Sequence, residues 1–318
     1  MLTFGLVVNP NAKYHRTRPL ARQQMISVCE RSSVRTLYGD SHSPSELTAI
    51  AERFCAANVD VLGISGGDGT GSMTLSAFRR VYGQRPLPAV ALLRGGTMNT
   101  VANSLGVPRL TPPELLRRAL SRCSQRRVET RTTDSMLVNE RDVGFLFGVG
   151  TVHAFLRAYY DAGDSQPTPT TALRVLGRGV GSAVIGGAYA RTITSRVNVA
   201  VTVDGEHWPL RDYFTVAAGA IDQIGLGFKP FHAKERQSQG FFHVVGWTLT
   251  IPQFARALPK IWRKRPLGPA AGWDRRATHL ELTAPDDKPL GYMLDGDLRQ
   301  HVGTLRVSLG PSVEMMVL

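Results

Sequence analysis

The stretch Val59-Asp-Val-Leu-Gly-Ile-Ser65-Gly-Gly-Asp-Gly-Thr-Gly71 places an apolar run directly before a glycine-rich loop. Residues 59–64 predict a buried strand, and residues 73–81 carry apolar residues at helical spacing. A strand that passes through a glycine turn into a helix is the repeating unit of an α/β domain. The stretch therefore predicts one such unit, with the loop at the carboxyl end of its strand.

The same alternation continues on both sides. Residues 2–8 and 87–93 predict further strands, and residues 47–57, 100–105 and 112–120 predict helices. Alternating strands and helices favour a parallel sheet with helices on its faces. We therefore predict an N-terminal Rossmann-like parallel α/β domain over residues 1–128.

The pattern changes after residue 127, where strand-like runs follow one another with little helix between them. This is typical of an antiparallel β-sandwich. We assign it to residues 129–318 and leave open a return of the last strand to the first domain. The expected strands are residues 144–152, 197–203, 213–218, 241–246, 279–282 and 305–309.

Composition limits the classes of partner. The chain has 318 residues and a formal net charge of +13, which suits nucleic acid, phosphate-bearing small molecules or an anionic membrane. No nucleic-acid-binding motif is present, so nucleic acid is not an expected partner. Cys29, Cys55 and Cys123 are scattered, so neither a disulfide framework nor a zinc site is expected. No signal peptide or stretch of 18 uninterrupted apolar residues is present, and a cytoplasmic location is expected.

Two glycine loops carry most of the functional signal. Ser65-Gly-Gly-Asp-Gly-Thr-Gly71 follows one predicted strand, and Arg94-Gly-Gly-Thr-Met-Asn99 follows the next. Ligands of open α/β sheets bind at the carboxyl ends of strands, and glycines let backbone N–H groups approach phosphates there. Asp68 indicates phosphoryl transfer, because a carboxylate beside phosphates needs Mg²⁺ or a proton between them. The alternative is that the glycines only make tight turns and Asp68 caps a helix.

A third loop, Asn9-Pro-Asn-Ala-Lys13, follows the first predicted strand and is expected beside the other two. Its Asn-Pro pair is also a common turn signal, so alone it says little. Near the C-terminus, Asp295-Gly296-Asp297 supplies two further carboxylates, and Asp-Gly is equally a hairpin signal.

In their order and spacing these motifs resemble the catalytic region shared by diacylglycerol kinases, sphingosine and ceramide kinases and bacterial soluble lipid kinases. The resemblance includes Thr36 before Gly39-Asp40, and it extends more weakly over nearly the whole chain. It implies a nucleotide cleft between the two domains, with Mg²⁺-ATP as donor and a membrane lipid as acceptor. The residues it places around ATP are Asn9, Pro10, Asn11, Ala12, Lys13, Thr36, Gly66, Gly67, Asp68, Gly69, Thr70, Gly71, Ser72, Gly96, Thr97 and Asn99.

The resemblance also makes Asp297, the second acid of Asp-Gly-acid, the acceptor of the lipid hydroxyl's proton. Asp295 and Asp68 are the competing candidates for this role, and Asp68 is the candidate contact to Mg²⁺. The chain departs from the family pattern at Ser72-Met73, at Arg94 and at Thr100. Gln239-Gly240 stands where relatives have an acid that helps to hold a separate Mg²⁺, which puts such a site in doubt. The Glu usual at position 297 is shortened to Asp.

Contact with an anionic membrane is expected from residues 254–265, where Phe254, Leu258, Ile261 and Trp262 alternate with Lys and Arg. A basic surface helix packed by its apolar side is the alternative, and Pro259 argues against a regular helix. The expected enzyme is a cytoplasmic lipid kinase held peripherally at the inner membrane surface. A kinase for a soluble nucleotide such as NAD, and a catalytically silent binding relative, remain the alternatives. The sequence leaves the particular lipid and any homo-oligomer open.

Overall fold

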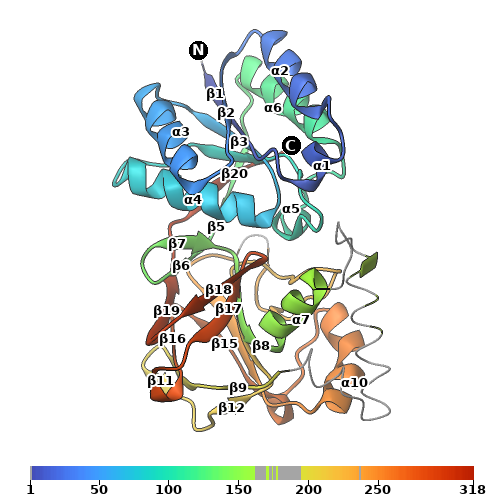
Figure 1. Ribbon diagram of the computed structural model, residues 1–318, viewed down its shortest axis with the longest axis vertical. Helices are drawn as coiled ribbons and strands as arrows, with labels where there is room; N and C mark the ends of the chain where they lie inside the picture. The colour runs from blue at the N-terminus through green and yellow to red at the C-terminus, as the bar shows by residue number, and fades with distance from the viewer. Residues whose placement is uncertain (1, 162–169, 172–173, 175–176, 178–194, 236–237) are drawn as a thin grey trace. The chain divides into compact units, whose positions relative to one another are not determined.

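The computed structural model describes residues 2–161, 170–171, 174, 177, 195–235 and 238–318. The chain divides into two compact units (Figure 1), one of Met1–Thr133 with Ser312–Leu318 and one of Asp134–Pro311. The sequence put the first boundary at residue 128, and the contacts put it after Thr133.

One six-stranded sheet, in the order β2-β1-β3-β4-β20-β5, forms the centre of the first unit. Every residue of β1 (Thr3–Val8) and β3 (Val61–Ser65) is buried, as in strands covered on both faces. β2 (Arg35–Asp40), β1, β3 and β4 (Ala89–Leu92) are mutually parallel. This confirms the predicted parallel α/β domain.

Helices cover both faces of this sheet, with α3 and α4 on one side and α2 and α6 on the other (Figure 1). The ring centroids of Phe54 and Phe78 lie 6.0 Å apart between α3 and α4. A Cβ at Gly5 of β1 would lie 2.5 Å from the Phe54 ring, so this glycine makes room for α3. The helices are α1 (Lys13–Arg16), α2 (Ala21–Glu30), α3 (Pro44–Ala56), α4 (Asp68–Tyr82), α5 (Thr100–Ser104) and α6 (Pro112–Ser124).

The end of the chain lies in the first unit. β20 (Val313–Met316) is inserted between β4, to which it is parallel, and β5 (Thr130–Thr133), to which it is antiparallel. The chain therefore completes its first sheet only after it has built the second unit.

The second unit is antiparallel, as predicted. One six-stranded sheet has the order β11-β10-β16-β19-β6-β7, and another has the order β15-β14-β13-β8-β17-β18. β9 and β12 form a separate pair. The strands are β6 (Met136–Val138), β7 (Asp142–Gly144), β8 (Leu146–Gly150), β9 (Val197–Asn198), β10 (Ala200–Val203), β11 (Glu206–His207), β12 (Asp212–Tyr213), β13 (Thr215–Gly219), β14 (Phe242–Trp247), β15 (Gly272–Ala277), β16 (His279–Thr283), β17 (Leu290–Leu294), β18 (Asp297–His301) and β19 (Thr304–Leu309).

Two helices of the second unit correct the sequence analysis. Residues 151–152 belong to α7 (Thr151–Tyr160) rather than to the preceding strand, because Gly150 turns the backbone with φ of 71°. α10 (Ile251–Trp262) continues through Pro259, which was expected to break it. Short 3₁₀ turns cover Pro269–Ala271 and Pro285–Asp287. Among the described residues, no helix has the length and hydropathy needed to cross a membrane.

Candidate active site

Three loops of the first unit meet at the carboxyl edge of the parallel sheet. The backbone N–H of Asn9, just after β1, donates to the Ser65 carbonyl at 3.0 Å. The N–H of Tyr14 donates to the Gly95 carbonyl, also at 3.0 Å. The sequence placed these loops together from strand order alone, and the hydrogen bonds join them directly.

The Asn9 side chain links the first loop to the second. Its Nδ2 donates to Thr70 Oγ1 at 2.9 Å, and its Oδ1 accepts the backbone N–H of Asn11 at 2.9 Å. The N–H of Ala12 returns to the Asn9 carbonyl, so the turn through Pro10 is closed before Lys13 begins α1. Asn9 therefore holds the turn, and the exposed Asn11 is left at its surface.

The two glycine loops pack backbone against backbone. A Cβ at Gly96 would lie 2.3 Å from the Cα of Gly67, and a Cβ at Gly95 would lie 2.8 Å from the backbone nitrogen of Gly66. Side chains at positions 95 and 96 would force the loops apart. Gly95 and Gly96 are therefore required for the loops to approach each other. A Cβ at Gly67 would lie 3.4 Å from the Cα of Gly96, which is an ordinary contact distance.

Most of the first glycine motif is helical. The helix α4 begins at Asp68, five residues before the predicted start, so the loop proper is Gly66-Gly67. Gly69, Thr70, Gly71 and Ser72 form the first turns of this helix. Thr70 and Ser72 are buried, and Thr70 Oγ1 accepts a hydrogen bond from Asn9 Nδ2. Their expected contacts with phosphate stay predictions.

Asp68 caps the neighbouring helix α5. Its Oδ2 accepts the backbone N–H of Thr100 at 2.8 Å, and its Oδ1 accepts the N–H of Val101 at 3.0 Å. Burial raises the pKa of Asp68, and the hydrogen bonds from Thr100 and Val101 oppose that rise without cancelling it. Asp68 therefore does cap a helix, as the alternative interpretation expected, and that helix is α5 rather than α4.

The second glycine loop is closed by Asn99 and leaves Thr97 without a protein partner. Asn99 Oδ1 accepts the N–H of Gly96 at 3.0 Å, and its Nδ2 donates to the Gly96 carbonyl at 2.9 Å. Asn99 is therefore committed to the loop. Within the described residues, the Thr97 hydroxyl makes no hydrogen bond and is partly exposed, so it is available to a ligand.

Arg94, where the chain departs from the family pattern, contacts α5 and the segment that follows it. Its Nη2 donates to Asn103 Oδ1 at 2.6 Å and to the Val107 carbonyl at 2.9 Å. Its backbone adopts φ of 52°. Its Nη2 therefore links α5 to the segment that follows it, while its buried Nε has no hydrogen-bond partner among the described residues.

Thr36 does not join this group. It pairs with Phe4 in the register of β1 and β2, whereas Asp40 pairs with Val8 at the carboxyl end. Four residues of strand, about 13 Å, therefore separate Thr36 from that end of β2. This register places Thr36 away from the three loops, and its expected contact with ATP stays a prediction.

His15 lies in the cluster but was missed by the sequence analysis. Its Nε2 is 2.7 Å from the Ser65 hydroxyl, and burial lowers its pKa, which the nearby Asp40 only partly offsets. The His15 Nδ1 is buried and has no hydrogen-bond partner within the described part of the chain. A single histidine in a short helix gives no pattern, so only the fold reveals this contact.

In the second unit, Asp295-Gly296 forms the two-residue turn between β17 and β18. Both residues have positive φ, 46° and 89°, as a tight hairpin requires. Asp295 is 2% exposed, and its carboxylate accepts the backbone N–H groups of Phe145 at 3.0 Å and Leu146 at 2.8 Å. Its position is that of a buried structural anchor for the adjacent strands.

Asp297 directly follows this turn and remains partly exposed, at 40% of its side chain. Its Oδ2 lies 3.8 Å from Nη2 of Arg299, whose Nη1 is 2.8 Å from Asp142 Oδ2. Burial raises the pKa of Asp297, and the positive charge of Arg299 counteracts part of that rise. Of the two acids in the turn, Asp297 is the one available to a substrate.

The parallel sheet and its joined glycine loops define an α/β domain of the class that binds ligands at the carboxyl ends of its strands. More narrowly, residues 3–132 match the model of the diacylglycerol kinase catalytic domain, and this segment belongs to that domain family. This match supports a kinase, a class of enzyme that uses ATP with a divalent metal. None of the curated proteins compared with this sequence matches it significantly.

Solved structures share the fold of the whole chain. A diacylglycerol kinase from Bacillus anthracis aligns with a TM-score of 0.64 and 16% identity over 99% of this chain and 97% of that chain. Another structure from the same organism gives a TM-score of 0.71 with the same identity and coverage. Yeast NADH kinase in complex with NADH aligns with a TM-score of 0.52 and 11% identity, over 100% of this chain and 84% of that one.

Proposed function

We propose that this protein is a lipid kinase that transfers the γ-phosphate of ATP to the primary hydroxyl of a diacylglycerol-, ceramide- or sphingoid-type lipid. The observation that carries the proposal is the junction of two glycine loops and the Asn9 turn at one sheet edge, within a segment of the diacylglycerol kinase catalytic family.

The junction suits a nucleotide because its exposed surface is largely backbone. The first N–H groups of α4 lack acceptors within the helix, and the positive end of the helix dipole adds attraction for phosphate. Thr97 offers a free hydroxyl beside them. Lys13 is half-buried at the start of α1 and makes no ion pair within the described part of the chain, so its ammonium is available to phosphate oxygens.

Asp68 fits Mg²⁺ as a partner of its bound water molecules. Each carboxylate oxygen already accepts one backbone N–H, but a carboxylate offers about four acceptor sites in all. Mg²⁺ keeps several waters in kinase sites, and those waters are donors for the remaining acceptor sites of Asp68. When bound, the metal neutralises charge on the transferring phosphate. The protein's own contribution is to hold Asp68 fixed against α5.

Asp297 is proposed as the acceptor of the lipid hydroxyl's proton. A hydroxyl must lose its proton as its bond to phosphorus forms, and a raised carboxyl pKa strengthens the base. Asp295 is proposed to position Asp297, because its carboxylate accepts the N–H groups of Phe145 and Leu146 and so fixes the turn that precedes Asp297.

An anionic membrane surface is the proposed site of action, with α10 as the contact. The structure changes the expected anchor. Phe254 packs on Phe214 with ring centroids 4.8 Å apart, and Ile261 is buried, so neither is free to insert. Trp262 is 58% exposed and is surrounded in sequence by exposed basic residues. Those residues are Arg256, Lys260, Arg263 and Arg265.

A panel of lipids tests the acceptor. The full chain is incubated with ATP, Mg²⁺ and mixed micelles of diacylglycerol, monoacylglycerol, ceramide or sphingosine, with NAD as a soluble acceptor in a parallel reaction. We expect one lipid class to gain a phosphate by mass spectrometry. Phosphorylated NAD would favour the soluble-substrate alternative. ATP binding without any transfer would favour a silent relative.

A further inference from the structure

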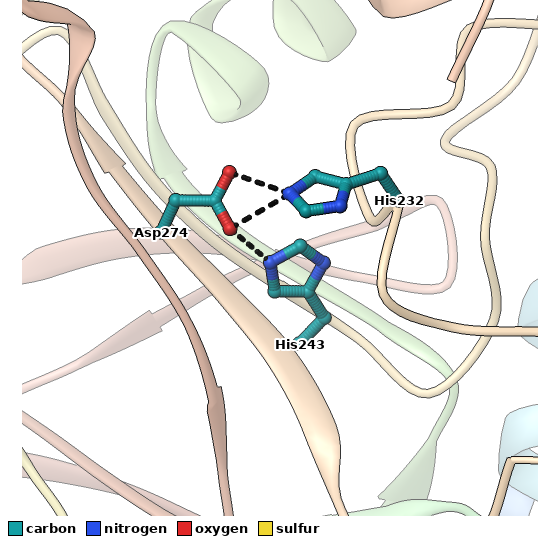
Figure 2. A group of neighbouring side chains, drawn as sticks. All are labelled: His232, His243 and Asp274. Atoms are coloured by element: carbon teal, nitrogen blue, oxygen red, sulfur yellow. Dashed lines mark hydrogen bonds and ion pairs between the residues drawn. The ribbon is translucent and has the colours of Figure 1, made fainter. Parts of the chain in front are cut away.

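Three potential metal ligands gather in the second unit, in residues to which the proposed kinase reaction gives no role (Figure 2). They are His232, from the loop before β14, His243 of β14 and Asp274 of β15. One ligand atom from each lies within 4.8 Å of the others. Figure 2 shows both imidazole rings directed at the same carboxylate, with His232 Nε2 3.0 and 2.8 Å from the two Asp274 oxygens.

The sheet register explains how these side chains meet. In the antiparallel pair β14–β15, Val245 lies opposite Asp274 and His243 lies opposite Arg276. Residues two apart in a strand share a face, so His243 and Asp274 point to the same side of the sheet as diagonal neighbours.

Two buried neighbours hold His232 in place. Phe231 is fully buried and packs against the His243 ring with centroids 6.1 Å apart. On the other side, Lys234 forms a buried ion pair with Asp134 at 3.0 Å. The short segment between these anchors has little freedom, so His232 is positioned by the fold before any ion binds.

We propose that His232, His243 and Asp274 bind a divalent transition-metal ion of the zinc class. Two imidazole nitrogens and one carboxylate oxygen form a donor set that suits such ions, whereas Mg²⁺ prefers oxygen ligands. Three protein ligands leave a fourth position for water. The scattered cysteines gave no hint of the site, because its ligands come from three segments that only the fold brings together.

An ion would replace the two protons that now join the rings to Asp274. Tetrahedral bonds of about 2.0–2.1 Å place ligand atoms about 3.3 Å apart, so the present separations of 2.8 Å for His232 and 2.5 Å for His243 must widen slightly. Each imidazole would move its proton from Nε2 to Nδ1, and at His243 this would release the N–H of Ala233, a weak contact at 3.3 Å. Asp274 is exposed, so an ion has a path to the buried His243.

This site is distinct from the turn that carries Asp297. β15 and β18 are the two edges of one six-stranded sheet, about 24 Å apart at the usual strand spacing. Bound metal would join β14, β15 and the loop of His232, so its expected effect is on the stability of this edge.

Zinc binding by the full chain tests the proposal. After treatment with a chelator, the protein competes for Zn²⁺ with a chromophoric indicator, and Co²⁺ serves as a spectroscopic probe of imidazole coordination. We expect one Zn²⁺ per chain, with affinity reduced at least tenfold in His232→Gln and in Asp274→Asn. His279→Gln is the matched control, because His279 is 71% exposed on β16 and lies outside the cluster.

Thermal unfolding supplies the second readout. Excess Zn²⁺ should raise the Tm of the wild type and of His279→Gln, and leave that of His232→Gln unchanged, because only ligands of the folded state stabilise it. Circular dichroism establishes that His232→Gln is folded. The proposal is overturned if the wild type binds no Zn²⁺ at one per chain, or if both cluster variants bind it as tightly as the control. Either result would leave the three residues as a hydrogen-bonded group only.

Discussion

Two aspartates of this protein make the same hydrogen bonds in different surroundings. Asp68 accepts the N–H groups of Thr100 and Val101, and Asp204 accepts those of Thr278 at 3.0 Å and His279 at 2.8 Å. Burial raises the pKa of Asp68. At Asp204 the weaker effect of burial is outweighed by the two backbone donors, the Thr278 hydroxyl and the charge of Arg275, which together lower the pKa. Variants of these two aspartates can therefore distinguish a capping role, which both share, from a catalytic role, which we propose for Asp68 alone.

We expect Asp68→Asn to reduce kcat for phosphoryl transfer roughly 10²-fold or more. Both Asp68→Asn and Asp204→Asn should lose about 1 kcal/mol of stability, because an amide accepts these N–H groups less well. Asp204→Asn should keep wild-type turnover. Steady-state kinetics and urea unfolding of the two variants make the comparison. Near-normal kcat in Asp68→Asn would reduce Asp68 to a helix cap.

A similar pair tests the proposed base. Asp297→Asn should lower kcat by roughly 10²–10⁴-fold at saturating ATP, because the amide keeps the shape but accepts no proton. Asp142→Asn is its control, since Asp142 contacts the same Arg299 at 2.8 Å. That control should change kcat little. A loss below about threefold in Asp297→Asn, small against the range above, would transfer the role to Asp68.

The pKa of Asp297 gives a pH dependence with a definite sign. Burial raises this pKa and Arg299 partly lowers it. As the pH falls through it, protonation removes the base, so kcat should decline on the acidic side. Arg299→Met removes the lowering charge and should move this decline to higher pH. The kcat–pH profiles of wild type, Arg299→Met and Asp297→Asn measure it, and an unmoved profile in Arg299→Met would count against the assignment.

Whole elements show where the sequence predicted structure and where it could not. The sequence analysis predicted β1 and β3 from their apolar runs, because a strand that is covered on both faces consists of consecutive hydrophobic residues. β2 lacks such a run, since most of its residues are only half-buried, and it was missed. In α10, Thr250 and Gln253 form a capping box at the start of the helix, and the helix continues through Pro259.

The candidate site divides in the same way. The glycine loops could be predicted from the sequence, because only glycine at position 96 allows its close backbone approach to Gly67. The hydrogen-bond partners of the side chains in these loops could not be predicted from the sequence. Asn9 and Asn99 were expected at ATP, yet they are engaged within the loops. Such contacts join residues distant in sequence, so no local pattern records them.

The exposed side of α10 carries a prediction of its own. Lys260→Gln, Arg263→Gln and Arg265→Gln together should weaken binding to phosphatidylserine vesicles, since each basic residue near an anionic surface contributes roughly 1 kcal/mol. Lys264 is left unchanged, because it donates to the Lys234 carbonyl at 2.6 Å. Wild-type binding should also fall as salt rises. Vesicle sedimentation measures both effects.

Three exposed arginines elsewhere provide the control for that experiment. Arg117→Gln, Arg118→Gln and Arg126→Gln together remove the same charge from α6 and the turn after it. If this variant loses as much vesicle binding as the α10 variant, the attraction comes from net charge rather than from α10. Equal binding by the wild type and the α10 variant at low salt would make the helix a solvated surface.

At the scale of the whole molecule, the chain must return to its first unit to complete it. β20 stands between β4 and β5, so without it the parallel sheet ends at β4 and β5 loses its partner. Val313, Met315 and Met316 are buried there, while Glu314 is exposed. The first unit therefore depends on residues that follow the second unit in the sequence.

Deleting residues 312–318 should consequently unfold the first unit rather than trim a terminus. Burying one large apolar side chain contributes roughly 1.5–3 kcal/mol, and the deletion removes Val313, Met315 and Met316 from the core. Their sum is comparable to the whole stability of a typical domain, about 5–15 kcal/mol. We expect loss of ATP binding in calorimetry and loss of the first unit's protection from proteolysis. Glu314→Ala is the control: it keeps the strand and removes an exposed carboxylate that contacts Thr132 at 2.6 Å, so it should bind ATP normally. ATP binding by the truncated chain would mean that the nucleotide-binding edge folds without β20.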